Sequence, residues 1–128
     1  MSNVSNNSVC ENGAGVPACL FCKIIAGEIP CDKVYEDDLV IGFRDIYPVA
    51  PHHILVVPKT HIPSANHINE ENSQIVAHIF VIAKNLVAEF GFSDAGYRIV
   101  NNCGSDGGQT VGHLHFHIIA GREGGSMY

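Results

Sequence analysis

The sequence predicts an α+β domain in which one long and one short helix cover a five-stranded antiparallel sheet. Five short apolar segments are separated mostly by brief polar turns, as is typical of antiparallel strands. The segment 70–90 instead repeats its apolar residues at helical spacing. With 128 residues, 46% of them hydrophobic, and no internal repeat, the chain is expected to form one core.

Residues 1–18 are rich in serine, asparagine and glycine and carry few large apolar side chains. They bury too little surface to offset the entropy of ordering, so we predict a disordered tail at 1–18 and a domain at 19–128. No basic and then apolar stretch marks a secretory signal, so we expect a cytoplasmic location, with the nucleus also accessible. In that reducing setting the five cysteines favour free or metal-bound thiols.

The first half of the domain is predicted to be a short helix followed by three strands. Residues 19–27 place apolar side chains four apart and end in glycine, which indicates the helix. Residues 33–36 and 39–44 predict a hairpin around the acidic pair at 37–38. Residues 53–58 are apolar nearly throughout, which is typical of a central strand.

The long helix is predicted to begin at Glu70, after an Asn69 cap, and to end at Gly91. Its principal apolar residues, three and four positions apart, are Ile75, Ile79, Ile82, Leu86 and Phe90. The stripe is broad enough to cover a sheet and leave area for a second subunit. A homodimer and burial of the whole stripe within one chain both stay open. Strands at 97–101 and 113–119 complete the sheet.

The charge balance narrows the possible partners. A net charge of −6 counts against general nucleic-acid binding, which needs lysine and arginine to neutralise phosphates. No apolar run approaches 18 residues, so neither a transmembrane helix nor a membrane partner is expected. A small phosphorylated ligand remains compatible, because backbone N–H groups and histidines can hold phosphate without a basic surface.

The final strand carries the most informative pattern. Successive side chains of a strand point to opposite faces, so His113, His115 and His117 are predicted to share one face, with Leu114 and Phe116 on the other. Two of these histidines could bind one metal ion, or the three could form a catalytic row of one nucleophile and its supports. Three partly exposed strand histidines are the plain alternative.

The loop before that strand, residues 104–110, is rich in glycine and favours phosphate. Successive N–H groups in such a turn form a concavity that binds anions, although a glycine-rich hairpin turn is the alternative. Neutral imidazole is a good nucleophile near pH 7 and can attack phosphorus. The loop and His117 could donate to the non-bridging oxygens, and Thr110 could give its hydroxyl proton to a leaving group.

Cys19 and Cys22, in Cys-x-x-Cys spacing, form half of a zinc site. The sequence has no second such pair, so histidines would have to complete a structural tetrahedron, and the candidates are His61 and His113. A thioredoxin-like redox motif is the weaker alternative, since that motif follows a strand. Two cysteines that merely pack at a helix start are the third.

Several motifs together carry a resemblance to a known family. They are His113-Leu-His115-Phe-His117-Ile-Ile, Phe21-Cys-Lys-Ile-Ile-Ala-Gly-Glu-Ile-Pro30, Phe43-Arg-Asp45-Ile46, Pro51-His-His53, Pro58-Lys-Thr-His61 and Gly104-Ser-Asp-Gly-Gly-Gln-Thr110. From Cys19 to about Arg122 the chain resembles the histidine triad (HIT) family, in particular its Hint-type branch of nucleoside phosphoramidate hydrolases. The resemblance implies a five-stranded sheet with two helices and a homodimer through the long helix and a strand edge.

The resemblance also implies roles for individual residues. His115 would be the nucleophile that attacks the α-phosphorus, giving a nucleotidyl-histidine that water hydrolyses. His117 and His53 would hold phosphate oxygens or orient the nucleophile. The implied substrate-binding residues are Phe21, Ile24, Ile29, Phe43 and Ile46 for the purine, Asp45 for the ribose, and Asn102, Gly108, Gln109, Thr110, His115 and His117 around the phosphate. For each apolar residue of this set, plain core packing is the alternative.

The implied function is cleavage of purine nucleoside 5′-phosphoramidates, with AMP or a related purine nucleotide as ligand. Zinc-binding members of the family use residues matching Cys19, Cys22, His61 and His113, which implies structural zinc and no organic cofactor. The alternatives are hydrolysis of dinucleoside polyphosphates, or a nucleotide-binding regulatory or scaffold protein with vestigial activity. Typical Hint-type proteins end in a Trp-containing tail, and the absence of tryptophan here leaves the leaving-group preference open.

Overall fold

A computed structural model of the protein describes residues 19–125. The tail predicted at residues 1–18 lies outside the described residues, as do residues 126–128 of the predicted domain. The described chain forms a five-stranded antiparallel sheet with one long and one short helix, which confirms the predicted fold class.

The elements follow the predicted order along the chain. They are α2 (Leu20–Ile25), β1 (Lys33–Glu36), β2 (Val40–Arg44), β3 (His52–Pro58), the 3-10 turn η1 (Ala65–His67), α3 (Ser73–Phe90), β4 (Tyr97–Val100) and β5 (Phe116–Ala120). The strands are ordered β1-β2-β3-β5-β4, and every neighbouring pair is antiparallel. The β3 strand is central and almost wholly buried, as its apolar sequence predicts.

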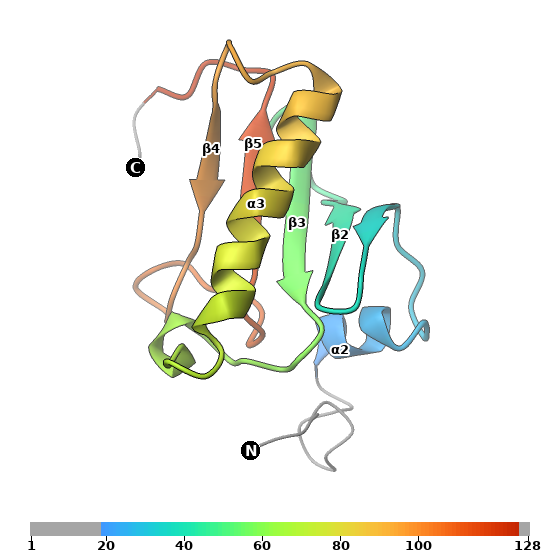
Figure 1. Ribbon diagram of the computed structural model, residues 1–128, viewed down its shortest axis with the longest axis vertical. Coiled ribbons are helices and arrows are strands. Elements are labelled where there is room, and N and C mark those ends of the chain that lie inside the picture. The colour runs from blue at the N-terminus through green and yellow to red at the C-terminus, as the bar shows by residue number, and fades with distance from the viewer. Residues whose placement is uncertain (1–18, 126–128) are drawn as a thin grey trace.

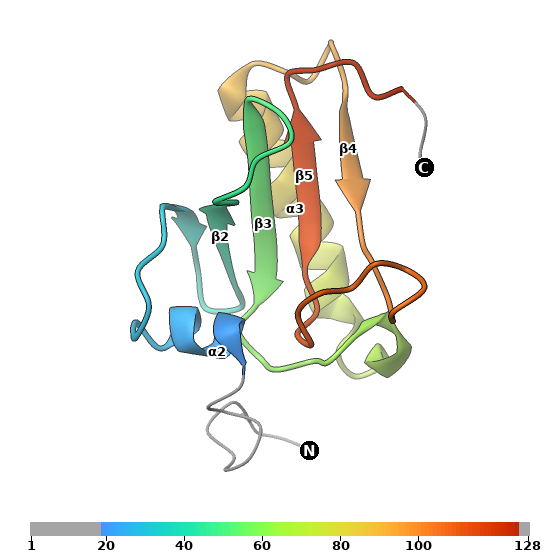
Figure 2. The same cartoon turned by 180° about the vertical axis from the view of Figure 1, so that it is seen from behind.

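The two faces of the sheet carry separate packed layers. Helix α3 crosses one face (Figure 1), where Ile79, Ala83 and Val87 pack with inward side chains of β3 and β5. The opposite face is turned to the viewer in Figure 2, with α2 at the end of the sheet near β2. There Phe21 of α2 packs with Phe43 of β2. The candidate site lies on this second face.

The long helix begins at Ser73, three residues later than predicted. The residue at the N-cap of α3 is Asn72, and Asn69 instead caps the preceding turn, because its Oδ1 accepts hydrogen bonds from the N–H groups of Glu71 (2.8 Å) and Asn72 (2.9 Å). In return, Asn72 Oδ1 accepts from the Asn69 N–H. This reciprocal pair resembles a capping box and holds the intervening residues as a turn before α3. The helix ends as predicted, with Gly91 at φ +86°.

The predicted histidine strand is regular only in its second half. β5 starts at Phe116, so His113 and His115 precede it, because the partner strand β3 ends at Pro58, which has no N–H for the ladder. The Leu114 N–H instead donates to the Ile62 carbonyl. The predicted division of faces is confirmed, since Leu114 is in the core beneath α3, while both histidine rings contact Phe21 on the other side.

Helix α3 is long and apolar enough, at 18 residues and a mean hydropathy of 1.2, to meet the length and composition of a membrane span. We had expected no apolar run of this length from the sequence. This property is weak evidence for a membrane, because core helices share it, and the inner side chains of α3, Ile79 and Leu86 among them, are packed on the sheet. Phe80 and Val81, on its outer side, are about half exposed.

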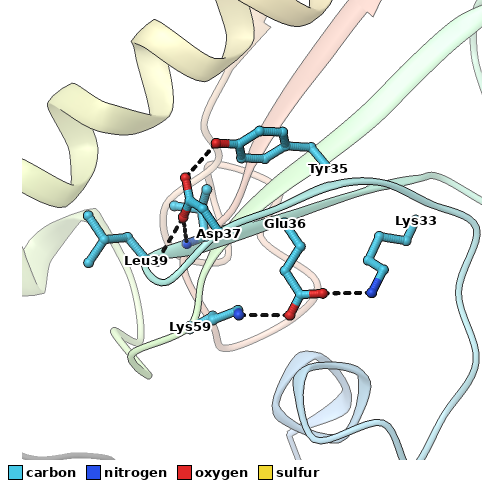
Figure 3. Close-up of polar contacts among 7 residues, drawn as sticks. Lys33, Tyr35, Glu36, Asp37, Leu39 and Lys59 are labelled. Carbon is cyan, nitrogen blue, oxygen red and sulfur yellow. Dashed lines mark hydrogen bonds and ion pairs between the residues drawn. The ribbon is translucent and has the colours of Figure 1, made fainter.

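The β1–β2 hairpin is closed by Asp37, as Figure 3 shows. Its Oδ1 accepts from the N–H groups of Leu39 (2.8 Å) and Val40 (2.9 Å), and its Oδ2 accepts from the Tyr35 hydroxyl. His78 of α3 contacts the same Oδ2 at 2.6 Å. This one carboxylate therefore joins the hairpin to the helix on the far face of the sheet.

Candidate active site

The centre of the candidate site is a pair of histidines on adjacent strands. In the β3–β5 register, His53 lies opposite Ile119 and His117 lies opposite Leu55. The two histidines are therefore diagonal neighbours on one face, and His53 Nε2 is 2.9 Å from His117 Nδ1. Sequence alone did not indicate this pairing, because it depends on the register between distant strands.

The backbone of Val49 determines which nitrogen of His53 carries the proton. The Val49 N–H donates to His53 Nδ1 over 3.2 Å, so this nitrogen presents its lone pair. The proton of the neutral ring is then on Nε2, which donates to His117 Nδ1. His117 in turn keeps its proton on Nε2, where it can donate to a bound oxyanion. Asp45 Oδ2 is 3.4 Å from His53 Nε2.

His115 carries its proton on the other ring nitrogen from His53 and His117. Its Nδ1 is 2.7 Å from the carbonyl oxygen of His113, so Nδ1 carries the proton and donates it, and Nε2 presents a lone pair. The ring meets Phe21 edge-on at 5.0 Å between centroids and lies 5.2 Å from the ring of His117. The Nε2 lone pair is therefore oriented beside a hydrogen-bond donor, an arrangement that could attack the phosphorus of a bound phosphate group.

The supporting histidines are neutral at physiological pH. Burial, together with smaller electrostatic effects of His115 and His53 and against the opposing effect of Asp45, lowers the pKa of His117 to about 4. Burial also lowers the pKa of His53, again partly opposed by Asp45. Neutral rings preserve the directional hydrogen bond between them.

The four predicted metal ligands come together at the end of the sheet. Both Cys19 and Cys22 place Sγ 3.2–3.5 Å from the Nδ1 atoms of His61 and His113, and these two Nδ1 atoms are 3.1 Å apart. Ligands of a tetrahedral zinc ion with ordinary Zn–S and Zn–N bonds would be about 3.3–3.8 Å apart. The arrangement could therefore hold a metal ion, and its donor set and spacing fit zinc.

The environment of His113 adds to this fit. The side chain is fully buried, and its Nε2 lies 2.8 Å from the Pro58 carbonyl oxygen. A ligating histidine usually donates its second N–H to such a group, which orients the ring. Burial lowers the pKa of His113 to about 3, so its Nδ1 lone pair is available to a metal. The same residue supplies the carbonyl that orients His115.

The residues expected to bind the purine divide into two groups. Phe21, Ile24 and Phe43 are buried together, and Ile29 packs at their edge. Ile46 is 81% exposed, on the loop between β2 and β3. The first group forms a packed apolar layer in contact with the histidines through Phe21, whereas Ile46 does not belong to this layer.

The side chains of the glycine-rich loop largely stabilise the loop itself. Asn102 Nδ2 donates to the Gly107 carbonyl (2.7 Å), and Gln109 Oε1 accepts from the Gly104 N–H (2.9 Å). Gln109 Nε2 also donates to the Pro63 carbonyl. A Cβ at Gly107 would lie 2.3 Å from the Cys103 carbonyl oxygen, so this position requires glycine.

Two further residues of this loop, Gly108 and Thr110, were expected to contact the phosphate. Gly108 adopts φ +85°, and Thr110 is exposed directly before the segment that holds the histidines. The loop thus has the predicted turn, while the amide groups of Asn102 and Gln109 are engaged by its own backbone.

Comparison with known proteins determines the family. The HIT domain model matches residues 26–124. This chain belongs to the HIT domain family. The matched range contains every histidine of the site and of the metal cluster, and it begins after Cys19 and Cys22. The HIT match therefore covers the face of the sheet that carries the histidines, whereas the cysteine pair lies on a segment that precedes the match.

Several relatives of this HIT protein cover most of its length. The purine nucleoside phosphoramidase of Escherichia coli K12 is 44% identical over 108 residues, which are 84% of this chain and 91% of that protein. A histidine triad protein from Clostridium difficile is 54% identical with a TM-score of 0.82, over 86% of this chain and 96% of that one. A HIT family hydrolase from Legionella pneumophila is 48% identical with a TM-score of 0.81, over 82% and 94%.

Proposed function

We propose that this HIT protein hydrolyses purine nucleoside 5′-phosphoramidates to a nucleoside monophosphate and an amine. The observation that carries the proposal is the orientation of His115, whose Nδ1 is held by a carbonyl while Nε2 presents a lone pair beside His117. The family match and the E. coli purine nucleoside phosphoramidase support hydrolase activity on a nucleotide. The proposal adds the bond cleaved and the residues that cleave it.

The reaction proceeds in two steps on the α-phosphorus. His115 Nε2 attacks phosphorus, the P–N bond to the amine breaks, and the amine nitrogen takes the electron pair and a proton donated by Thr110, which is replenished from solvent. Water then attacks the nucleotidyl-histidine, loses a proton, and returns the electron pair of the P–Nε2 bond to His115. His117 and His53 stabilise the charge on the phosphate oxygens.

The nucleoside lies toward β2 and α2 in this proposal. Phe21, Ile24 and Phe43 form the floor under the purine, with Ile29 beside them and Ile46 above the base. Asp45 accepts hydrogen bonds from the ribose hydroxyls. The loop residues Asn102, Gly108, Gln109 and Thr110 approach the phosphate.

Steady-state rates on adenosine 5′-phosphoramidate and on a diadenosine polyphosphate test the proposal. We expect the first to be the better substrate, and His115→Asn to lower its kcat by about a thousandfold or more. The same substitution at exposed His67 is the control and should leave the rate unchanged. Mass spectrometry of the quenched reaction should find a nucleotidyl adduct on His115.

Other outcomes would overturn the proposal. Faster cleavage of the diadenosine polyphosphate would assign the protein to that substrate class instead. No turnover of either substrate by the intact protein, together with measurable AMP binding, would indicate a nucleotide-binding protein without this activity.

We also propose that the four-residue cluster holds zinc as a structural ion, with no organic cofactor. The ion would hold the start of α2 against the end of the sheet and would restrain His113. Because the His113 carbonyl accepts a hydrogen bond from His115 Nδ1–H, restraining His113 also restrains the nucleophile through the protein backbone.

We further propose that the protein is a homodimer in the cytoplasm. Phe80 and Val81 leave apolar surface on the outer side of α3, and within residues 19–125 the outer edge of β4 has no strand partner. Val81→Glu should shift sedimentation toward the monomer, whereas Lys84→Glu, at an exposed polar position of the same helix, should not. A monomeric wild-type protein at micromolar concentration would contradict the proposal.

A further inference from the structure

A hollow of about 450 Å³ lies at the β4 side of the sheet. Its lining includes Arg98 of β4, Ile119 of β5 and Val49 of the loop before β3, together with Arg122 and Gly124 from the segment after β5. In Figure 2 this last segment leaves the end of β5 and passes over to the side of β4. The proposed mechanism does not use the hollow.

The strand register places the hollow on the catalytic face. Arg98 lies opposite Ile119, which in turn lies opposite His53. Directly opposed residues of antiparallel strands share a face, so these three form one row across β4, β5 and β3. The next row on the same face contains His117. Rows on one face are separated by about 7 Å, so the hollow is adjacent to the phosphate position.

The charge of the hollow is unusual for this protein. The chain has a net charge of −6 and three arginines, and two of these, Arg98 and Arg122, line this one hollow. Each guanidinium is anchored by a carbonyl: Arg98 donates to Gly125, and Arg122 donates to Val49 over 2.8 Å. Within residues 19–125 neither arginine forms an ion pair, although Glu123 also lines the hollow.

The backbone further fixes the position of Arg98. A Cβ at Gly124 would lie 2.8 Å from Nε and Nη2 of Arg98, so the segment after β5 lies directly against the guanidinium. Val49 connects the other arginine to the catalytic centre, because its carbonyl accepts from Arg122 while its N–H donates to His53. The two cations are therefore held in place and attached to the catalytic machinery.

The geometry of in-line displacement also directs the leaving group toward the hollow. In-line displacement requires the leaving group to depart on the side of phosphorus away from the nucleophile. His115, His117 and Ile119 follow one another along one face, so a group departing away from His115 moves toward Ile119 and the hollow. The apolar floor for the nucleoside is on β2 and α2, at the other side of the histidines.

We propose that the hollow binds the leaving group and favours an amine that carries a carboxylate, as an amino acid does. Arg98 and Arg122 bind the carboxylate through charge-assisted hydrogen bonds, the geometry for which guanidinium groups are best suited. The proposal rests on the proposed function, since the bond that breaks is the same P–N bond and the amino acid departs as the amine.

Two substrates of nearly equal size test the proposal: adenosine 5′-phosphoramidates of alanine and of alaninamide. We expect the wild-type protein to prefer the alanine compound in kcat/KM by roughly ten- to a hundredfold, the range for hydrogen bonds to a charged group. Arg98→Gln and Arg122→Gln should each remove most of this preference. The ratio of the two kcat/KM values is the readout, because a general loss of folding or activity would lower both equally.

Arg44→Gln is the matched control. Arg44 contacts the ring of Phe90 on the α3 side of the sheet, so its removal should leave the ratio unchanged. An equal rate on both substrates with the wild-type protein, or a preference that survives both arginine substitutions, would overturn this inference and leave the proposed function intact. No cleavage of the alanine compound by a protein that cleaves adenosine 5′-phosphoramidate would also overturn this inference. Failure to cleave any of the three compounds would overturn the proposed function.

Discussion

His53 Nε2 lies 2.9 Å from His117 Nδ1, and the direction of this hydrogen bond is determined by the backbone N–H of Val49 on the other side of the His53 ring. Both rings must be neutral for this arrangement, because a protonated His117 would present a second donor to the His53 N–H. The pair therefore links the stability of the fold to pH.

The free energy of unfolding should fall as pH falls from about 6.5 to about 4. Burial lowers the pKa of His117 to about 4, whereas the unfolded chain has the ordinary histidine pKa of about 6.5. Between these values the unfolded state binds more protons, so stability increases with pH by about 1.4 kcal/mol per unit for each such histidine. Urea denaturation from pH 4 to 7.5 measures this slope.

His117→Asn should reduce the dependence of the free energy of unfolding on pH by about 1.4 kcal/mol per unit, because the unfolded state then binds one proton fewer. The matched control is His67→Asn, at an exposed histidine, which should keep the wild-type slope. If the His117 variant keeps the wild-type slope, the lowered pKa of His117 is not the source of the pH dependence of stability.

His113→Ala and His115→Ala should fail in different ways. His113 belongs to the metal cluster and is fully buried, so its loss should reduce metal content from about one ion per chain and lower the melting temperature. His115→Ala should retain both and lose turnover. Elemental analysis, calorimetry and steady-state rates distinguish the two variants. Equal metal content and stability in both would contradict the separate roles of His113 and His115.

Ile79→Ala should destabilise the protein by about 2–5 kcal/mol. Its side chain is completely buried between α3 and the sheet, so the substitution removes apolar contacts and leaves a cavity. The control is Lys84→Ala at an exposed polar position of the same helix, where the loss should be well under 1 kcal/mol. Denaturant unfolding of the two variants gives the comparison.

Asp37→Asn should weaken the attachment of α3 to the β1–β2 hairpin. Burial raises the pKa of Asp37, but hydrogen bonds from Tyr35, His78 and the backbone outweigh it and hold the pKa well below its usual value. The ionised carboxylate therefore stabilises the fold above its ordinary pKa, and we expect a loss of about 1–2 kcal/mol at pH 7. Asp38→Asn, at the exposed neighbouring position, should have little effect.

Local patterns in the sequence predicted most of the fold. The alternation from His113 to Ile119 correctly divided the two faces, and Gly91 correctly ended α3. The start of α3 was misplaced because Asn69 and Asn72 bond to each other and form a turn that delays the helix. The predicted last strand began too early, because its partner β3 stops at Pro58. Nothing within the histidine run itself indicates where the partner strand ends.

Strand alternation and helix spacing are properties of residues close together in the chain, so the residue types of the site and the face that each strand residue occupies could be read from the sequence. The ring nitrogen on which each histidine carries its proton depends on the folded structure. The bond from Val49 to His53, the carbonyl of His113 on His115 and the two arginines beside Ile119 all join segments through strand register and loop path. Hydrogen-bond direction depends on atoms brought together by folding, so the His53–His117 pair is a product of the fold.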